Sequence, residues 1–199
     1  MCGILVSVAV IDSPTATNAC TDLFPWIAAR GPDSLQTRQL QIPLEGSSQL
    51  LEVLFTSSVL SLRGEKVTQQ PLVSAAGDVL CWNGEIWKGL EITDEENDGL
   101  RLLEALSSTQ SIWKVMEKIE GPWAMVYLSL KDKMLWFGRD CLGRRSLLQK
   151  TDFRTLSLSS VGVNMNEWQE VSVDGLWRLD LLQWAATTER VWHSETDLT

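Results

Sequence analysis

The sequence predicts an α+β protein in which helices cover β-sheets. Of its 199 residues, 44 % are hydrophobic and 22 % are charged, a balance typical of one globular domain with a well-filled core. Strand-like segments come first, two segments with helical periodicity follow, and strand-like segments then return. Because strands and helices are grouped and do not alternate, this order favours stacked sheets with helices packed on them.

The first fifth of the chain predicts a strand, a helix and a loop. Residues 2–10 are apolar and rich in β-branched side chains, so we expect a buried strand that begins almost at the chain start. A short helix is predicted within residues 19–30, with Pro25 in its first turn, and Gly31-Pro32 ends it. Residues 34–48 are mostly polar and predict a loop.

The remainder of the chain predicts two helices flanked by short strands. After the acidic run 93–98, a first helix is indicated by leucines that share one face, Leu102, Leu103 and Leu106. A second helix, ended by Gly121-Pro122, is indicated by apolar residues at helical spacing, Ile112, Val115, Met116 and Ile119. Strands are expected at 51–62, 77–83, 124–130, 134–138, 145–149, 155–160 and 176–181. The strands expected on either side of Lys131-Asp132-Lys133 predict a hairpin.

Charge, the chain start and the cysteines argue against several classes of protein. The net charge is -9 and no basic stripe is visible, so nucleic acid is not an expected partner. The apolar run 4–11 follows no Lys or Arg and is too short to span a bilayer, so neither a secretory signal nor a membrane partner is expected. The four cysteines form no CxxC pair, and we interpret them as reduced thiols in a cytoplasmic protein.

The sequence also lacks the residues that several familiar kinds of catalytic site require. The one histidine, His193, is near the C-terminus, so Ser-His-Asp and Cys-His catalysis have no base near a candidate nucleophile. No Cys and His residues stand at metal-ligand spacing, and neither GxxxxGK[ST] nor GxGxxG after a strand occurs. We therefore predict no metal site and no nucleotide cofactor.

The start of the chain, Met1-Cys2-Gly3, offers a nucleophile that needs no histidine. A small residue after the initiator permits removal of Met1, which leaves Cys2 with a free α-amine. An α-amine titrates near pH ~7.7–8.0, so part of it is neutral at cytoplasmic pH. It can then act as general base for the thiol of the same residue, as in enzymes with an N-terminal threonine nucleophile.

Six motifs occur in the order found in class II glutamine amidotransferases, of the asparagine synthetase branch. They are Cys2-Gly3-Ile4, Arg30-Gly31-Pro32-Asp33, Gln70-Pro71-Leu72, Asn83-Gly84-Glu85-Ile86, Asp98, and Gly138-Arg139-Asp140 with Leu142-Gly143. The chain resembles that family from residue 2 to about 145, and more weakly to about 180. The resemblance implies a four-layer α-β-β-α sandwich of the N-terminal-nucleophile hydrolase type.

The resemblance also implies roles for individual residues. Cys2 would be the nucleophile, and the Asn83 side chain and the Gly84 N–H would bind the oxyanion. An Asn-Gly pair is otherwise a common turn, and Cys2 could be an incidental buried thiol. Asp98 would bind the α-ammonium of glutamine, although it also suits the N-cap position of the helix that follows. Arg30 is a second candidate for substrate binding, but with Asp33 we expect it to shape a loop.

One position departs from the family pattern. Counting back from Gln70-Pro71-Leu72, the arginine that holds the glutamine α-carboxylate falls on Val59. The nearest arginine, Arg63, is four residues further on, which along a strand is a shift of roughly 13 Å on the same face. Arg63 could bind the carboxylate only if the strand ends or bulges before it. Weak binding of glutamine is therefore expected.

As a whole, the resemblance implies a glutamine-hydrolysing enzyme that serves asparagine biosynthesis. Residues 2–180 would form the amidotransferase domain, and residues 181–199 would lead toward a synthetase domain, in a longer chain or acting in trans. A second interpretation is a degenerate domain that serves as a non-catalytic scaffold or regulatory module. Val59 favours this alternative, whereas the intact Cys2, Asn83, Gly84 and Asp98 oppose it.

Overall fold

The structure, a computed structural model, describes residues 1–12, 21–44, 46–61, 66–93, 95–152 and 155–191. Its strands form two antiparallel six-stranded sheets. The first has the order β10 (Gln169–Glu170), β8 (Leu148–Asp152), β9 (Thr155–Ser159), β1 (Gly3–Ile11), β3 (Leu50–Val59), β2 (Ser34–Pro43). The second has the order β12 (Ala185–Val191), β11 (Gly175–Asp180), β7 (Met134–Arg139), β6 (Trp123–Ser129), β5 (Val79–Gly84), β4 (Leu72–Val73).

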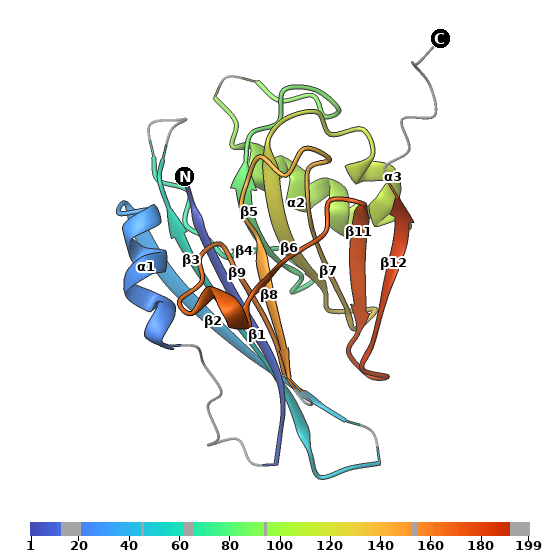
Figure 1. Cartoon of the computed structure of the whole chain (residues 1–199). Coiled ribbons are helices and arrows are strands. Elements are labelled where there is room, and N and C mark those ends of the chain that lie inside the picture. Colours follow the sequence, from blue (N-terminus) through green and yellow to red (C-terminus); the bar gives the residue numbers. More distant parts are fainter. Residues whose placement is uncertain (13–20, 45, 62–65, 94, 153–154, 192–199) are drawn as a thin grey trace.

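Helices flank the two sheets on their outer faces, so the molecule has four layers (Figure 1). Helix α1 (Phe24–Arg30) lies on the first sheet, and α2 (Asp98–Ser108) and α3 (Ile112–Met116) lie on the second. Three separate apolar clusters fill the spaces between these layers, and the largest lies between the sheets. The α-β-β-α sandwich that the resemblance implies is therefore confirmed. None of the described helices is long and apolar enough to cross a membrane.

Side chains along β1 alternate between the two faces of the first sheet, and this alternation sets the direction of Cys2. Ile4, Val6 and Val8 belong to the cluster between the sheets, whereas Leu5 packs in the cluster under α1. Because side chains alternate between the two faces of a strand, Cys2 has the same direction as Ile4, toward the second sheet. The sequence pattern of residues 2–10 predicted this buried strand correctly.

Alternation along β5 places a polar residue on the matching face of the second sheet. Val79 and Cys81 belong to the cluster between the sheets, and Leu80 and Trp82 belong to the cluster under α2. Asn83 therefore faces the first sheet, one step beyond Cys81. The apolar cluster between the sheets ends at this point, and polar side chains take its place.

Two parts of the chain differ from the sequence-based expectation. Residues 34–48 were expected to form a loop, but Ser34–Pro43 form strand β2, paired with β3 along its whole length. The strand lies at the sheet edge and most of its side chains are exposed, so its composition is polar, as in a loop. The strand expected at 145–149 begins only at Leu148, and the residues before it form a turn.

The other helices and strands agree with the predictions within a few residues. The helix at 19–30 is α1, with Pro25 in its first turn, and the predicted hairpin is β6–β7. The strand expected at 51–62 is β3, which ends at Val59. The second predicted helix is shorter than expected because α3 ends at Met116, although Ile119 still packs against the second sheet's outer cluster.

Candidate active site

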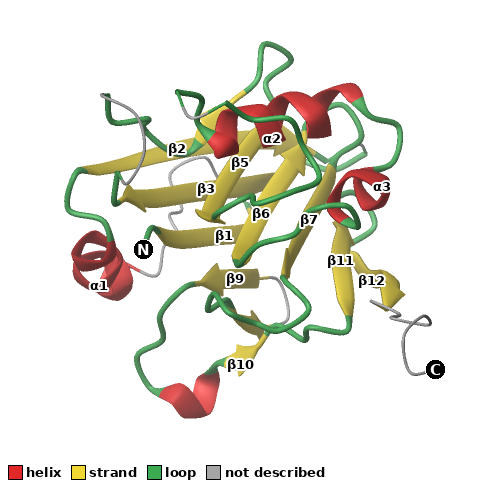
Figure 2. Ribbon diagram, turned by 90° about the horizontal axis from the view of Figure 1, so that it is seen from above, coloured by secondary structure: helices red, strands yellow, loops and turns green. Residues whose placement is uncertain are grey.

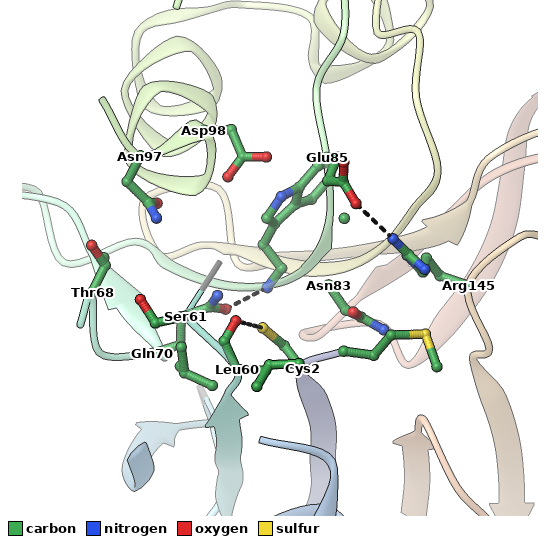
Figure 3. A pocket seen from close by; sticks show the side chains of 14 residues that line it. Cys2, Leu60, Ser61, Thr68, Gln70, Asn83, Glu85, Asn97, Asp98 and Arg145 are labelled. Atoms are coloured by element: carbon green, nitrogen blue, oxygen red, sulfur yellow. Dashed lines mark hydrogen bonds and ion pairs between the residues drawn. The ribbon is translucent and has the colours of Figure 1, made fainter. Parts of the chain in front are cut away.

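A pocket with a volume of about 210 Å³ opens where the apolar layer between the sheets ends (Figure 3). The first sheet contributes Cys2 from the start of β1 and Val59 from the end of β3, and the second contributes Asn83 and Gly84 from the end of β5. The remaining lining residues are Met1, Leu60, Ser61, Thr68, Gln70, Trp82, Glu85, Asn97, Asp98 and Arg145. Four of the six motifs, which are far apart in sequence, therefore meet in one cavity.

Cys2 is held firmly at the floor of this pocket. The Arg30 Nε donates a hydrogen bond to the Cys2 carbonyl (3.2 Å), and the Cys2 Sγ is 3.9 Å from the Leu60 carbonyl oxygen. The next residue must be small, since a Cβ on Gly3 would lie 2.6 Å from the Ser58 Oγ and 2.9 Å from the Ile27 carbonyl oxygen. This close approach of α1 and β3 explains the Cys-Gly pair.

The charge state of the Cys2 thiol follows from its surroundings. Burial raises the pKa of the thiol above its ordinary value, and the Leu60 contact and the positive charge at the chain start partly oppose that rise. The thiol is therefore protonated at neutral pH and needs a base before it can attack a substrate. Met1 lies in the same pocket, where it occupies the position next to the thiol.

Asn83 offers a hydrogen-bond donor that none of the described residues uses. The side chain is 2 % exposed, and within the described structure its Nδ2 atom has no hydrogen-bond partner. A buried donor without a partner costs roughly 1–3 kcal/mol, so folded proteins rarely keep one without a reason. A ligand oxygen in the pocket would satisfy it.

The backbone N–H of Gly84 points away from β6, toward the sheet edge where Gln70 lines the pocket. The N–H groups of neighbouring residues in a strand point in opposite directions. The Trp82 N–H donates to the Gln70 Oε1 (2.7 Å) and the Glu85 N–H to the Pro122 carbonyl (3.0 Å), so the Gly84 N–H shares the direction of Trp82. A Cβ at Gly84 would lie 2.7 Å from the Trp123 Cβ, which excludes any larger residue.

Asp98 is buried at the start of α2 and lines the pocket, but it is not the N-cap. The cap is Asn97, whose Oδ1 accepts a hydrogen bond from the Leu100 N–H (3.2 Å). The Asp98 carboxylate accepts from the Gly99 N–H (2.9 Å) and the Ile86 N–H (3.2 Å). These bonds hold the acidic group beside the segment that follows Asn83 and Gly84. The expectation that Asp98 caps the helix is corrected, because the chain enters α2 one residue earlier.

The three positions discussed for carboxylate binding have different surroundings. Arg30 supports the backbone of Cys2 and is not among the residues that line the pocket. Val59 is buried and lines the pocket, and β3 ends there. Arg63 lies outside the described residues.

A second arginine, which the sequence analysis did not single out, does line the pocket. The Nη2 atom of Arg145 is 3.1 Å from the Glu85 Oε1, and its buried Nε atom has no partner in the described part of the chain. Arg145 follows Gly138-Arg139-Asp140 in the turn before β8, a segment that the sequence pattern assigned to a strand. The only available signal was the Arg144-Arg145 pair directly after a glycine.

The turn that carries Arg145 is fixed by Asp140. The Asp140 carboxylate is 3 % exposed and accepts hydrogen bonds from the N–H groups of Trp123, Leu142 and Arg144, at 3.0–3.1 Å. The Arg144 Nε is 2.9 Å from the same carboxylate. The position of Arg145 therefore follows from a rigid turn and does not depend on the side chain of Arg145 itself.

Among the described residues, the other cysteines and the acidic side chains provide no second site of this kind. Cys2, Cys81 and Cys141 are free thiols, and Cys20 lies outside the described residues. Burial raises the pKa of the Cys81 thiol, and Cys141 is exposed outside this pocket. Within the residues that the structure describes, no three His, Cys, Asp or Glu side chains are grouped as metal ligands.

Known proteins resemble the chain in both fold and sequence. Two solved structures superpose on nearly the whole chain. A glutamine phosphoribosylpyrophosphate amidotransferase from B. subtilis has a TM-score of 0.63 and 11 % identity, and the match covers 97 % of this chain and 50 % of that one. An allosteric regulatory enzyme of purine biosynthesis has a TM-score of 0.64 and 11 % identity, and the match covers 96 % of this chain and 49 % of that one. At this identity the likeness concerns the fold. The chain therefore has the fold of the N-terminal-nucleophile amidotransferases. No protein-family model matches the chain.

Proteins that are similar to the chain in sequence identify a narrower group within this fold. Asparagine synthetase domain-containing protein 1 of Homo sapiens is 38 % identical over 91 % of this chain, and that of Gallus gallus is 37 % identical over 94 %. An asparagine synthetase domain-containing protein of Saccharomyces cerevisiae is 31 % identical over 74 % of this chain. The chain is therefore an asparagine synthetase-like domain of the class II glutamine amidotransferase fold. It spans only 28–30 % of the length of these relatives.

Proposed function

We propose that this domain hydrolyses the side-chain amide of glutamine to glutamate and ammonia, with Cys2 as the nucleophile. The observation that carries the proposal is the meeting of Cys2 and the unpartnered Asn83 Nδ2 in one pocket, from opposite sheets. An acyl-transfer site needs a nucleophile and donors for the oxyanion that forms when it attacks. Here Asn83 and the N–H of Gly84 are the donors, and Asp98 binds the α-ammonium of the substrate.

The reaction proceeds in two halves once Met1 is removed. The neutral α-amine of Cys2 takes the thiol proton, and the thiolate attacks the amide carbon. The carbonyl oxygen becomes an oxyanion held by Asn83 and Gly84, and the protonated amine gives its proton to the departing ammonia. Water, deprotonated by the same amine, then attacks the γ-glutamyl thioester, which releases glutamate and restores the thiol.

The wider role of the chain is part of the same proposal. Residues 2–180 act as the amidotransferase domain, and residues 181–199 lead toward a synthetase domain, in a longer chain or in trans, that uses the ammonia in asparagine biosynthesis. The short coverage of the relatives, about 28 % of the human protein, is consistent with this arrangement. We place the chain in the cytoplasm. The second candidate, a non-catalytic scaffold or regulatory module, is favoured by Val59 alone.

Labelling by 6-diazo-5-oxo-norleucine, an electrophile shaped like glutamine, tests the pocket directly. We expect Cys2 to be the one modified cysteine, because the pocket concentrates the reagent next to a thiol with its own base. Cys141 is the informative internal control, since its side chain is exposed but lies outside the pocket. Peptide mass spectrometry would locate the label.

Iodoacetamide, a small electrophile without a glutamine-like shape, is the matched reagent. It is expected to modify the exposed Cys141 as well as Cys2, and to spare the buried Cys81. If the glutamine analogue labels Cys141 as fast as Cys2, the pocket has no selectivity for glutamine. That outcome, together with absence of glutamine turnover, would favour the scaffold.

Val59→Arg tests the missing carboxylate partner. A pocket that lacks a cationic partner for the α-carboxylate would show a KM for glutamine that this variant lowers by ~10- to 100-fold with kcat nearly unchanged, because a charge-assisted hydrogen bond to the α-carboxylate is made equally in the ground and transition states. A pocket in which another arginine already binds the carboxylate would show little change in KM. Steady-state glutaminase kinetics would measure the effect. Val59→Met, which adds length without charge at the same buried position, is the control.

Two other outcomes have distinct meanings. An unchanged KM in Val59→Arg, together with a large rise in Arg63→Ala, would show that Arg63 already binds the carboxylate. Our assignment of Val59 to the position of the family arginine would then be wrong. No turnover in either the wild type or Val59→Arg would contradict the proposed activity.

A further inference from the structure

The pocket contains a charge arrangement that matches the two charges of a free amino acid. Among the described residues that line it, Arg145 is the one cationic side chain, and Glu85 and Asp98 are the acidic ones. A free amino acid carries a carboxylate and an ammonium group on the same carbon. Adjacent groups of opposite charge, such as Arg145 and Glu85 at 3.1 Å, are complementary to such a zwitterion.

The guanidinium of Arg145 has hydrogen-bonding capacity left over. An arginine binds a carboxylate best through two parallel N–H groups on one edge of the guanidinium. Here Nη2 is used by Glu85, while the adjacent Nε is buried and, within the described structure, without a partner. The side chain of Arg145 is 19 % exposed and that of Glu85 is 39 % exposed. Glu85 can therefore turn toward solvent or substrate more easily than Arg145 can.

Arg145 is also held in place independently of Glu85. The turn before it is tied to the buried Asp140, and the guanidinium of Arg144 lies over the Trp87 ring (5.2 Å). Figure 3 shows Arg145 and Glu85 on one side of the pocket, away from Thr68 and Gln70. The other candidate, Arg30, already donates its Nε to the backbone of Cys2 and does not line the pocket.

From these contacts we infer that Arg145 binds the α-carboxylate of the substrate, in place of the arginine that Val59 lacks. When the amino acid enters, its carboxylate takes the Nε and Nη2 edge of Arg145. Glu85, released from that edge, joins Asp98 in facing the α-ammonium. The pocket then selects free amino acids over amides without an α-carboxylate. This inference rests on the proposed function, because it assigns one end of the same substrate.

Binding measured without turnover tests the inference. In a Cys2→Ala background, isothermal titration calorimetry would compare L-glutamine with L-glutaminamide, in which a neutral amide replaces the α-carboxylate. We expect Arg145→Ala to weaken glutamine binding roughly 10- to 100-fold and to leave glutaminamide binding unchanged. Arg101→Ala, which removes an exposed arginine outside this pocket, is the charge-matched control and should alter neither.

A rescue variant separates binding from support of the pocket. Arg145→Ala combined with Val59→Arg should recover glutamine affinity, because a guanidinium returns to the lining of the pocket. Equal loss of both ligands in Arg145→Ala, without rescue, would show that Arg145 only supports Glu85 and the wall, and would overturn the inference. Unchanged glutamine binding in Arg145→Ala would overturn it too and leave the proposed function standing. Absence of glutamine binding in the Cys2→Ala parent would overturn both.

Discussion

A chain whose Cys2 amine is blocked is expected to hydrolyse glutamine on the order of 10⁴- to 10⁶-fold more slowly than the chain that begins at Cys2. Losses of this size are found when an enzyme loses its catalytic base or nucleophile. The reason is the state of the thiol. Burial raises the pKa of the Cys2 thiol, so little thiolate forms at neutral pH without a base. The single histidine is His193, near the C-terminus, and the α-amine is the base adjacent to the thiol.

The experiment compares one preparation in two forms. The protein would be made with an N-terminal extension and assayed before and after a site-specific protease exposes Cys2, with intact mass confirming each form. Retained Met1 should behave like the extension, since it blocks the amine and also lies in the pocket. Cys2→Ala, processed in the same way, is the control for loss of the thiol. Full activity in the extended form would show that the α-amine is not the base.

Asn83→Ala should lower kcat for glutamine by ~10²- to 10³-fold, with a smaller change in KM. The Asn83 Nδ2 is a buried donor without a partner in the described structure, so it is available to the oxyanion and is not needed elsewhere. The loss corresponds to ~2.7–4 kcal/mol of transition-state stabilisation and leaves the binding of ground-state glutamine largely intact.

Steady-state kinetics and a thermal unfolding curve together test this effect. Asn83→Asp is the matched variant: its shape is nearly the same, but the donor is replaced by a negative oxygen that repels the oxyanion, so kcat should fall at least as far. Variants that melt near the wild-type temperature exclude unfolding as the cause. A kcat within a few-fold of wild type in folded Asn83→Ala would mean that Asn83-Gly84 is an ordinary turn.

Local sequence patterns predicted most of the strands and helices because they depend on short-range alternation and helical spacing. The apolar run 2–10 indicated β1, and the strands around Lys131-Asp132-Lys133 indicated the β6–β7 hairpin. The same reasoning failed for β2, because an edge strand with most side chains in water has the composition of a loop. It also failed for the turn before β8, whose apolar residues resembled a strand.

The sequence by itself determined the order of the motifs and predicted the chemistry at the chain start. Cys2 next to a removable methionine, without a nearby histidine, already indicated an amine-assisted thiol. Tertiary structure alone decided which side chains share the pocket. Cys2, Asn83 and Arg145 come from the start of one strand, the end of another and a distant turn. They meet because the two sheets stack with the start of β1 and the end of β5 at the same edge of the core. No local pattern encodes that stacking, since it depends on long-range strand pairing and on how the buried faces of two sheets fit together.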